Sequence, residues 1–384
     1  MVQLSSGPRF RRGYYLGALL VGMSLTFRPA LWAQYSVSYV DLTPPGAFGG
    51  SLSSTSGSQQ GGAAGFPNVS VAGLWSGPSH QFTSLNPAGY SGSLISSAAG
   101  DQQAGAAYYG GGNHAGIWSG TAASFRSLNP PQSIDSMVFA TTGTRQAGYV
   151  TLTAPVFAVH AALWSGTAAS WVDLNPSPEA NSTAYAIAGN QQAGTVYLPV
   201  GQHAAIWSGT AASFVDMNPV GARGSEISAT TGSQQAGVAA FGDSGHAAVW
   251  SGTPGSFVDL HPAGATDSQL KATIGTHQAG NVWYADPVAF RVGHAALWFG
   301  TAENVLDLND VLGSGFRESR AEGLWGNGTT IQVAGHAFTQ EGYSRPILWT
   351  VTIPEPSTGA ICLLVGGLAL IQARQRKSSG LAAL

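Results

Sequence analysis

The chain contains very little cysteine and very little charge. Its 384 residues include one cysteine, which excludes a disulfide scaffold and any zinc site built from cysteines. Only 9% of the residues are charged, and the formal net charge is −3, so the chain is not a generally basic nucleic-acid binder. With 53 glycines, 20 prolines and 44% hydrophobic residues, it is rich in turns and can still form a core.

The few charges are unevenly distributed along the chain. Four arginines precede residue 29, and three basic residues fall within the last eleven positions. All 18 acidic residues lie between Gln34 and Pro356, where only 8 basic residues accompany them. The acidic body is therefore not attracted to phosphate backbones or anionic lipids, and the two basic ends require a separate explanation.

The first 33 residues have the layout of a secretory signal peptide. Arg9, Arg11 and Arg12 form a positive region, and the uncharged apolar stretch from Tyr14 to Phe27 follows it. Ala33 supplies a small residue at the expected cut. A retained membrane anchor is the alternative, but a span needs about 20 apolar residues and this stretch is shorter.

The C-terminal end combines three elements in a fixed order. Pro354, Glu355 and Pro356 precede an apolar run at 358–373, which predicts a transmembrane helix, and the basic cluster comes directly afterwards. This cluster should stay on the cytoplasmic side of the membrane, which places the body outside. The cluster consists of Arg374, Arg376 and Lys377.

This arrangement over residues 353–377 resembles the PEP-CTERM sorting signal of Gram-negative bacteria, with residues 378–384 as a short tail. The resemblance implies a partner, an exosortase-like membrane protease that recognises Pro-Glu-Pro and removes the end of the chain. Contact with the membrane through the C-terminal helix would then last only until processing. A plain C-terminal anchor is the alternative reading.

The body, residues 34–352, consists of repeats of 43–51 residues, each marked by a tryptophan in segments such as AIWSGTAASFVDMNP. The repeated tryptophans are Trp75, Trp118, Trp164, Trp207, Trp250, Trp298 and Trp349. Each unit contains four short β-prone pieces separated by Gly, Pro and Asn turns, and none has helical periodicity. The period predicts an all-β, seven-bladed propeller of four-stranded repeats, in which the tryptophans fill the gaps between blades.

The ends of the body also indicate ring closure. A Val-Asp-Leu piece at Val40 precedes the first tryptophan unit, and no such piece follows Trp349. The first strand is therefore expected to complete the last blade. The Gln-Ala-Gly, His-Ala-Ala-Leu-Trp and Asp-Leu pieces resemble the extracellular HAF repeats, which implies an exported protein and supplies no catalytic residues to transfer.

Several polar residues recur at fixed repeat positions, and repetition favours structural roles for them. A ring of metal-binding histidines is the alternative for the first set, but its members are expected to hydrogen-bond a backbone carbonyl or a neighbouring blade. Aspartate at its position is expected to make a turn or inter-strand hydrogen bond, and the glutamines are expected to satisfy turns. The positions are His114, His160, His203, His246 and His294; Asp41, Asp173, Asp216, Asp259 and Asp307; and the pairs 59–60, 102–103, 191–192 and 234–235.

Residues that break the repeat are better candidates for a ligand site. Tyr108, Tyr109, Trp283 and Tyr284 stand in the most variable segments, where exposed aromatic rings could stack on sugar rings. Packing at hairpin ends is the alternative interpretation.

No catalytic, metal or cofactor motif is apparent in the sequence. We therefore expect a non-enzymatic protein of the cell envelope or extracellular matrix that binds exopolysaccharide or surface proteins. A polysaccharide lyase or hydrolase on a propeller scaffold, and a purely structural adhesion or coat protein, are the alternatives.

Overall fold

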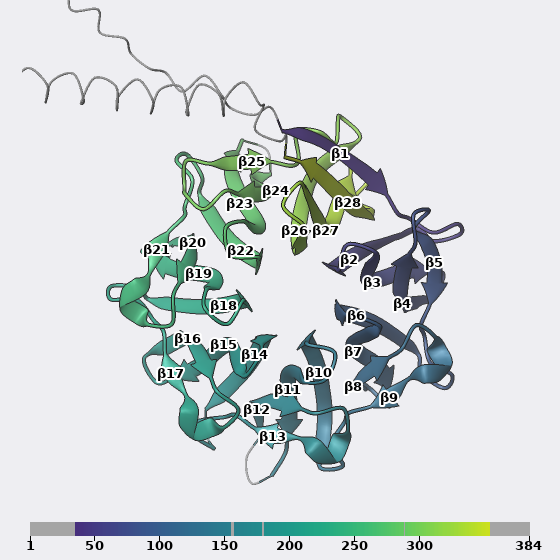
Figure 1. The fold of residues 1–384 in the computed structure, drawn as a ribbon, viewed down its shortest axis with the longest axis vertical. Helices are drawn as coiled ribbons and strands as arrows, with labels where there is room; N and C mark the ends of the chain where they lie inside the picture. The colour runs from purple at the N-terminus through teal and green to yellow at the C-terminus, as the bar shows by residue number, and fades with distance from the viewer. Residues whose placement is uncertain (1–34, 155–156, 179, 288, 354–384) are drawn as a thin grey trace, which may run out of the picture. The chain divides into compact units, whose positions relative to one another are not determined.

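The computed structural model describes residues 35–154, 157–178, 180–287 and 289–353. The predicted signal peptide, the Pro-Glu-Pro motif, the 358–373 helix, the basic cluster and the tail lie outside these residues. Within them, seven four-stranded antiparallel sheets surround one axis (Figure 1). The all-β, seven-bladed propeller is thereby confirmed. No helix within the described ranges is long and apolar enough to span a membrane.

Each blade is numbered by its inner strand, which lines the axis. The inner strands of blades 1–7 are β2 (Gly49–Thr55), β6 (Gly92–Ala99), β10 (Ser133–Thr141), β14 (Asn181–Ala188), β18 (Gly224–Thr230), β22 (Asp267–Thr273) and β26 (Phe316–Gly326). The second strands are β3 (Gln59–Phe66), β7 (Gln102–Tyr109), β11 (Gln146–Leu152), β15 (Gln191–Leu198), β19 (Gln235–Phe241), β23 (Gln278–Asp286) and β27 (Thr330–Thr339).

The third strands carry the repeated tryptophans. They are β4 (Val69–Ser76), β8 (Gly112–Trp118), β12 (Ala158–Trp164), β16 (Gly201–Trp207), β20 (Ser244–Trp250), β24 (Phe290–Trp298) and β28 (Ser344–Thr352). The outer strands are short in six blades: β5 (Gln81–Ser84), β9 (Arg126–Ser127), β13 (Val172–Asp173), β17 (Val215–Asp216), β21 (Val258–Asp259) and β25 (Val305–Asp307).

Four single-turn 3₁₀ helices join third to outer strands in blades 2–5, where the Gly-Thr-(Ala/Pro)-(Ala/Gly)-Ser segments lie. They are η1 (Ala122–Ser124), η2 (Ala168–Ser170), η3 (Ala211–Ser213) and η4 (Pro254–Ser256). The outer strand then leads into the next blade, so the sequence repeat and the blade are offset by one strand. We call the side of the ring where these outer-to-inner segments run the connector face.

Blade 7 is completed by the first strand of the body, as the sequence predicts. β1 (Ser36–Asp41) pairs antiparallel with β28, with Val40 opposite Leu348 and Ser36 opposite Thr352. The sheet order β1-β28-β27-β26 makes β1 the outer strand of that blade (Figure 1). We call this β1–β28 pair the clasp. It ties the two ends of the described chain into one sheet.

The core lies between the blades. All seven repeated tryptophans are at most 1% exposed. Trp207 of β16, for example, belongs to one hydrophobic cluster with Ala161 and Leu163 of β12 in the preceding blade. Alanines on the facing strands allow the sheets to approach, and the indole fills the remaining space, as expected from the sequence.

The seven repeated indole N–H groups differ in their hydrogen bonding. Trp75, Trp298 and Trp349 donate to backbone carbonyls of Leu42, Leu260 and Leu308 at 2.8, 2.9 and 3.0 Å. The other four indole nitrogens have no hydrogen-bond partner among the described residues: Trp118, Trp164, Trp207 and Trp250. Packing rather than hydrogen bonding therefore fixes these rings.

Candidate functional site

The repeated histidines pair with the repeated aspartates. Nδ1 of His203 lies 2.8 Å from Oδ2 of Asp216, and the same contact spans 2.6–2.8 Å in three other blades. The expected backbone or neighbouring-blade partner is wrong, because the third and outer strands of one blade pair Ala205 with Asp216. That register puts the histidine diagonally opposite the carboxylate on the same face of the sheet. The other three pairs are His160–Asp173, His246–Asp259 and His294–Asp307.

The aspartates also cap turns, which confirms the sequence interpretation. Oδ1 of Asp216 accepts the backbone N–H of Asn218 at 2.8 Å, and each repeated aspartate accepts the N–H two residues later in the same way. The second glutamine of the pairs serves turns too: Gln235 Oε1 accepts the N–H of Gly252 at 2.8 Å. Among the described residues, no group of three or more His, Cys, Asp or Glu could hold a metal ion.

A repeated relay joins neighbouring blades on the connector face at six of the seven interfaces, with His261 in place of the asparagine between blades 5 and 6. Ser225 Oγ donates a hydrogen bond to Asn218 Oδ1 at 2.6 Å. The same Ser225 Oγ accepts a hydrogen bond from the N–H of Ala204 at 3.0 Å. Asn218 leads into blade 5, Ser225 lies on its inner strand, and Ala204 belongs to blade 4. The buried relay serines are Ser93, Ser136, Ser182, Ser225, Ser268 and Ser319.

The relay is absent at one interface, the seam between blades 7 and 1. There, Thr43 stands at the Asn position, Gly50 at the Ser position and Pro346 at the Ala position. The three changes are chemically coordinated, because proline has no N–H for a serine to accept. Ser344 of blade 7 instead donates to the carbonyl of Gly50 at 2.8 Å.

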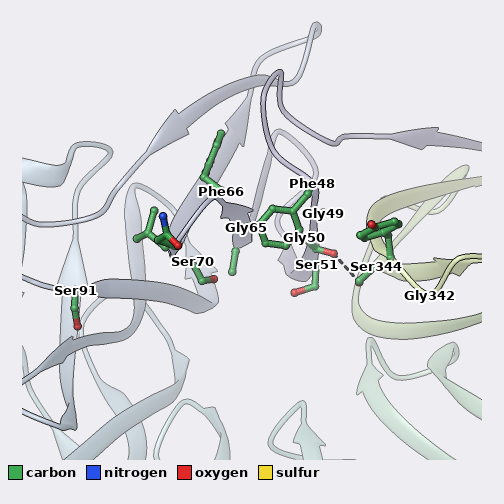
Figure 2. A pocket seen from close by; sticks show the side chains of 14 residues that line it. Phe48, Gly49, Gly50, Ser51, Gly65, Phe66, Ser70, Ser91, Gly342 and Ser344 are labelled. Carbon is green, nitrogen blue, oxygen red and sulfur yellow. Dashed lines mark hydrogen bonds between the residues drawn. The ribbon is translucent and has the colours of Figure 1, made fainter.

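A groove of about 640 Å³ opens at this seam on the connector face (Figure 2). Figure 2 shows its labelled residues extending from Ser91 of blade 2, across blade 1, to Gly342 and Ser344 of blade 7. Glycine is required in its floor, since a Cβ on Gly49 would lie 2.4 Å from the carbonyl oxygen of Ser344. The close approach of blades 7 and 1 therefore depends on that residue.

The groove is lined by aromatic rings and uncharged polar groups. Phe48 is 54% exposed and Tyr343 is 52% exposed, while Phe66 is half-buried. The ring of Phe48 lies over Gly65, where an added Cβ would be 3.0 Å from ring carbons. The side chains of Ser51 and Asn68 make no hydrogen bond to any described residue, so they can bind a ligand. No charged residue lines the groove.

The sequence-predicted aromatics lie on the same face but do not form one site. Tyr108 and Tyr109 end β7 in blade 2, whereas Trp283 and Tyr284 lie near the end of β23 in blade 6. These blades stand on opposite sides of the ring (Figure 1). None of the four lines the seam groove.

Local contacts account for most of these side chains. Trp283 lies against the guanidinium groups of Arg291 and Arg320, 5.6 and 5.2 Å from the ring centroid. Both arginines are already paired, at 2.7 Å with Asp267 and at 2.9 Å with Glu318. Such contacts favour the alternative of hairpin-end packing at blade 6.

The tyrosines of blade 2 differ in exposure. Tyr109 packs against Tyr90 and His114, with ring centroids 5.5 Å apart in each case, yet it stays 57% exposed. Tyr108 is half-buried, and burial raises its pKa. Tyr109 therefore remains available as an isolated contact rather than as part of a cavity.

The groove residues were missed because they do not look unusual in the sequence. The available signal is the coordinated loss of Asn, Ser and a backbone N–H at positions 43, 50 and 346. Each position is unremarkable alone, and only the closed ring brings blade 7 against blade 1, where Ser344 contacts Gly50.

Comparisons with known proteins agree on the fold. No family model and no curated protein sequence matches the chain. The propeller domain of the Trilobed protease from Pyrococcus furiosus, described as having an open velcro topology, is similar with a TM-score of 0.51 and 7% identity, over 81% of this chain and 97% of that one.

Two enzymes resemble the structure of this chain to a similar degree. Oligogalacturonate lyase from Vibrio parahaemolyticus aligns with a TM-score of 0.50 and 10% identity, over 84% of this chain and 97% of that one. Pyrococcus horikoshii acylaminoacyl peptidase aligns with a TM-score of 0.51 and 9% identity, over 81% of this chain and 53% of that one. At these identities the likeness establishes the propeller architecture alone.

Proposed function

We propose that this chain is an exported, non-enzymatic protein of the cell envelope or extracellular matrix, and that its propeller binds a neutral polysaccharide in the seam groove. The signal-peptide layout of residues 1–33 and the PEP-CTERM-like order of residues 353–377 support export. An exosortase-like protease is the proposed processing partner, and processing ends the contact of the C-terminal helix with the membrane.

The observation that carries the binding proposal is the chemistry of the groove. Sugar rings present apolar C–H faces and a rim of hydroxyl groups. Phe48 and Tyr343 offer half-exposed rings for the faces, and Ser51 and Asn68 offer free polar groups for the rim. Because no charged residue lines the groove, nothing there compensates the carboxylate of a uronic acid.

Affinity electrophoresis of the ring, residues 34–353, through gels containing dextran, galactomannan or alginate tests this function. The ring contains the seven core clusters of the described residues and its own closing strand, so it is expected to fold without the terminal segments. We expect retardation by at least one neutral polymer and none by the uronate polymer alginate.

Replacing Phe48 and Tyr343 together by alanine should weaken retardation at least 10-fold, because both stacking surfaces are lost. Tyr197→Ala is the matched control, since Tyr197 is 49% exposed and lies outside the groove. Equal retardation of the double variant would contradict the proposed site. Absence of binding to every polymer would favour the structural coat, and release of new chain ends from a polymer would favour the enzyme.

A further inference from the structure

Each inner strand contains a β-bulge at the same place. The register between first and second strands shifts around one residue in every blade, for example between Ile227 and Ala229 in blade 5. A bulge leaves one residue unpaired and re-aims its side chain. The seven unpaired residues are Ser53, Ser96, Phe139, Tyr185, Ser228, Lys271 and Glu322.

All seven bulge residues line one cavity of about 600 Å³, formed by the inner strands around the axis. We call them the axial ring. Whereas the residues directly before and after the bulge are small or aliphatic in every blade, the axial ring is strongly asymmetric. Blades 3 and 4 contribute Phe139 and Tyr185, whose ring centroids lie 5.1 Å apart. Blades 6 and 7 contribute Lys271 and Glu322, and serines leave space between the two pairs.

The two charged groups of the axial ring are unpaired. Within the described part of the chain, neither Lys271 nor Glu322 makes a hydrogen bond or an ion pair. Burial raises the pKa of Glu322, while the nearby Lys271 and Arg320 act in the opposite direction. A third charge in the cavity, Glu226, is satisfied by Gln202 at 3.1 Å and Ser228 at 3.2 Å.

Unpaired charges in a partly enclosed cavity cost stability unless a ligand satisfies them. Lys271 and Glu322 stand on the inner strands of adjacent blades, β22 and β26. The Lys271 charge is close enough to affect the pKa of Glu322, but the two side chains are too far apart to form an ion pair. A ligand that carries an anionic and a cationic group on adjacent atoms bridges such a gap. The opposite wall, Phe139 and Tyr185, fits an apolar or aromatic body.

We propose that the axial cavity binds a free α-amino acid with a large apolar side chain. Its carboxylate pairs with the Lys271 ammonium, its ammonium pairs with the Glu322 carboxylate, and its side chain lies against Phe139 and Tyr185. A neutral sugar would leave both charges unsatisfied, and a simple anion or cation would leave one. This site is separate from the seam groove and independent of the glycan proposal.

Isothermal titration of the full chain in mild detergent with L-phenylalanine tests the site. N-acetyl-L-phenylalanine, which lacks the cation, and L-phenylalanine amide, which lacks the anion, are the matched probes. We expect saturable binding of L-phenylalanine and at least 10-fold weaker binding of each derivative. No saturable binding of L-phenylalanine, or a derivative that binds equally well, would overturn the proposal.

Variants of the axial ring complete the test. Lys271→Met and Glu322→Gln should each weaken binding of L-phenylalanine at least 5-fold, and Lys271→Arg should restore most of it. Glu341→Gln, which removes a carboxylate from the exposed surface of blade 7 outside the cavity, should change the Kd less than 2-fold. The apo Met and Gln variants should unfold at no lower temperature than the wild type. Lower unfolding temperatures with unchanged affinity would indicate a structural role and contradict the site.

Discussion

At the scale of single residues, most polar side chains that recur in the repeat join or cap neighbouring strands. The Asp216 carboxylate caps a turn through one oxygen and contacts His203 through the other. The sequence is enough to predict the turn, because an aspartate that accepts the backbone N–H two residues later is a local pattern. It does not reveal the histidine contact, which depends on the pairing of Ala205 with Asp216 across two strands.

His336 is a half-buried residue whose titration should affect stability. It lies on β27 opposite Arg320, its Nδ1 has no hydrogen-bond partner among the described residues, and burial together with Arg320 lowers its pKa to about 4. Glu318 acts in the opposite direction. The folded ring therefore binds a proton less readily than the unfolded chain, whose histidine titrates near pH 6.5.

Because the folded-state pKa of His336 is depressed, the stability gained by keeping its imidazole neutral is complete above pH 6.5 and is lost as the pH falls toward 4. We expect the free energy of unfolding to drop by up to about 3 kcal/mol across this window through His336 alone. Urea unfolding of wild type and His336→Phe at a series of pH values measures the difference. Curves that stay parallel from pH 7 to pH 4 would refute it.

At the scale of elements, the clasp controls whether the ring stays closed. Leu42 donates its N–H to the carbonyl of Pro346 at 2.8 Å, and alternation along an antiparallel pair directs the Val40 N–H to β28 as well. The side chain of Val40 is 47% exposed, so its replacement changes the ladder and not the core.

Val40→Pro should lower the free energy of unfolding by about 2 kcal/mol, because it removes a ladder hydrogen bond and leaves a carbonyl of β28 unpaired. Val40→Thr keeps the N–H and the β-branched shape, and it should stay within about 0.5 kcal/mol of wild type. Thermal and urea unfolding of the three proteins measure the effect. If the Val40→Pro and Val40→Thr variants have the same free energy of unfolding, β1 does not hold the ring closed.

The elements differ in how readily the sequence reveals them. The four pieces of each repeat and the unpaired Val-Asp-Leu at Val40 are local signals, and both the blades and the clasp follow from them. The bulge at Tyr185 is not local: it exists because Ala184 and Ala186 pair with adjacent residues of β15, Gly194 and Ala193. No composition rule marks such a residue, so the axial ring could be identified only in three dimensions.

At the scale of the whole molecule, the repeat spacing is enough to predict the blade number, whereas the destination that the terminal patterns indicate stays a prediction. The seam groove is different in kind. It arises from three departures from the repeat, at positions 43 and 50 and, about 300 residues later, at position 346, which meet only when the ring closes.

The proposed route of export gives a prediction for the entire chain. Replacing Glu355 with alanine should block recognition by the exosortase-like protease, so that the full C-terminal tail is retained in the membrane fraction of the native host. Glu341→Ala is a matched control on the exposed surface of blade 7. Intact-mass measurement of secreted and membrane-bound protein distinguishes the forms. Equal secretion of both variants would argue against processing at Pro-Glu-Pro.

The geometry of the clasp has a mechanical consequence. Ser36 and Thr352 face each other at the same end of the β1–β28 pair, so tension applied through the two ends of the described chain loads the hydrogen bonds one after another. Such a load unzips a strand at lower force than a load that shears all of its bonds together. A ring pulled from both ends would therefore release β1 first and present the free edge of β28 to any strand nearby.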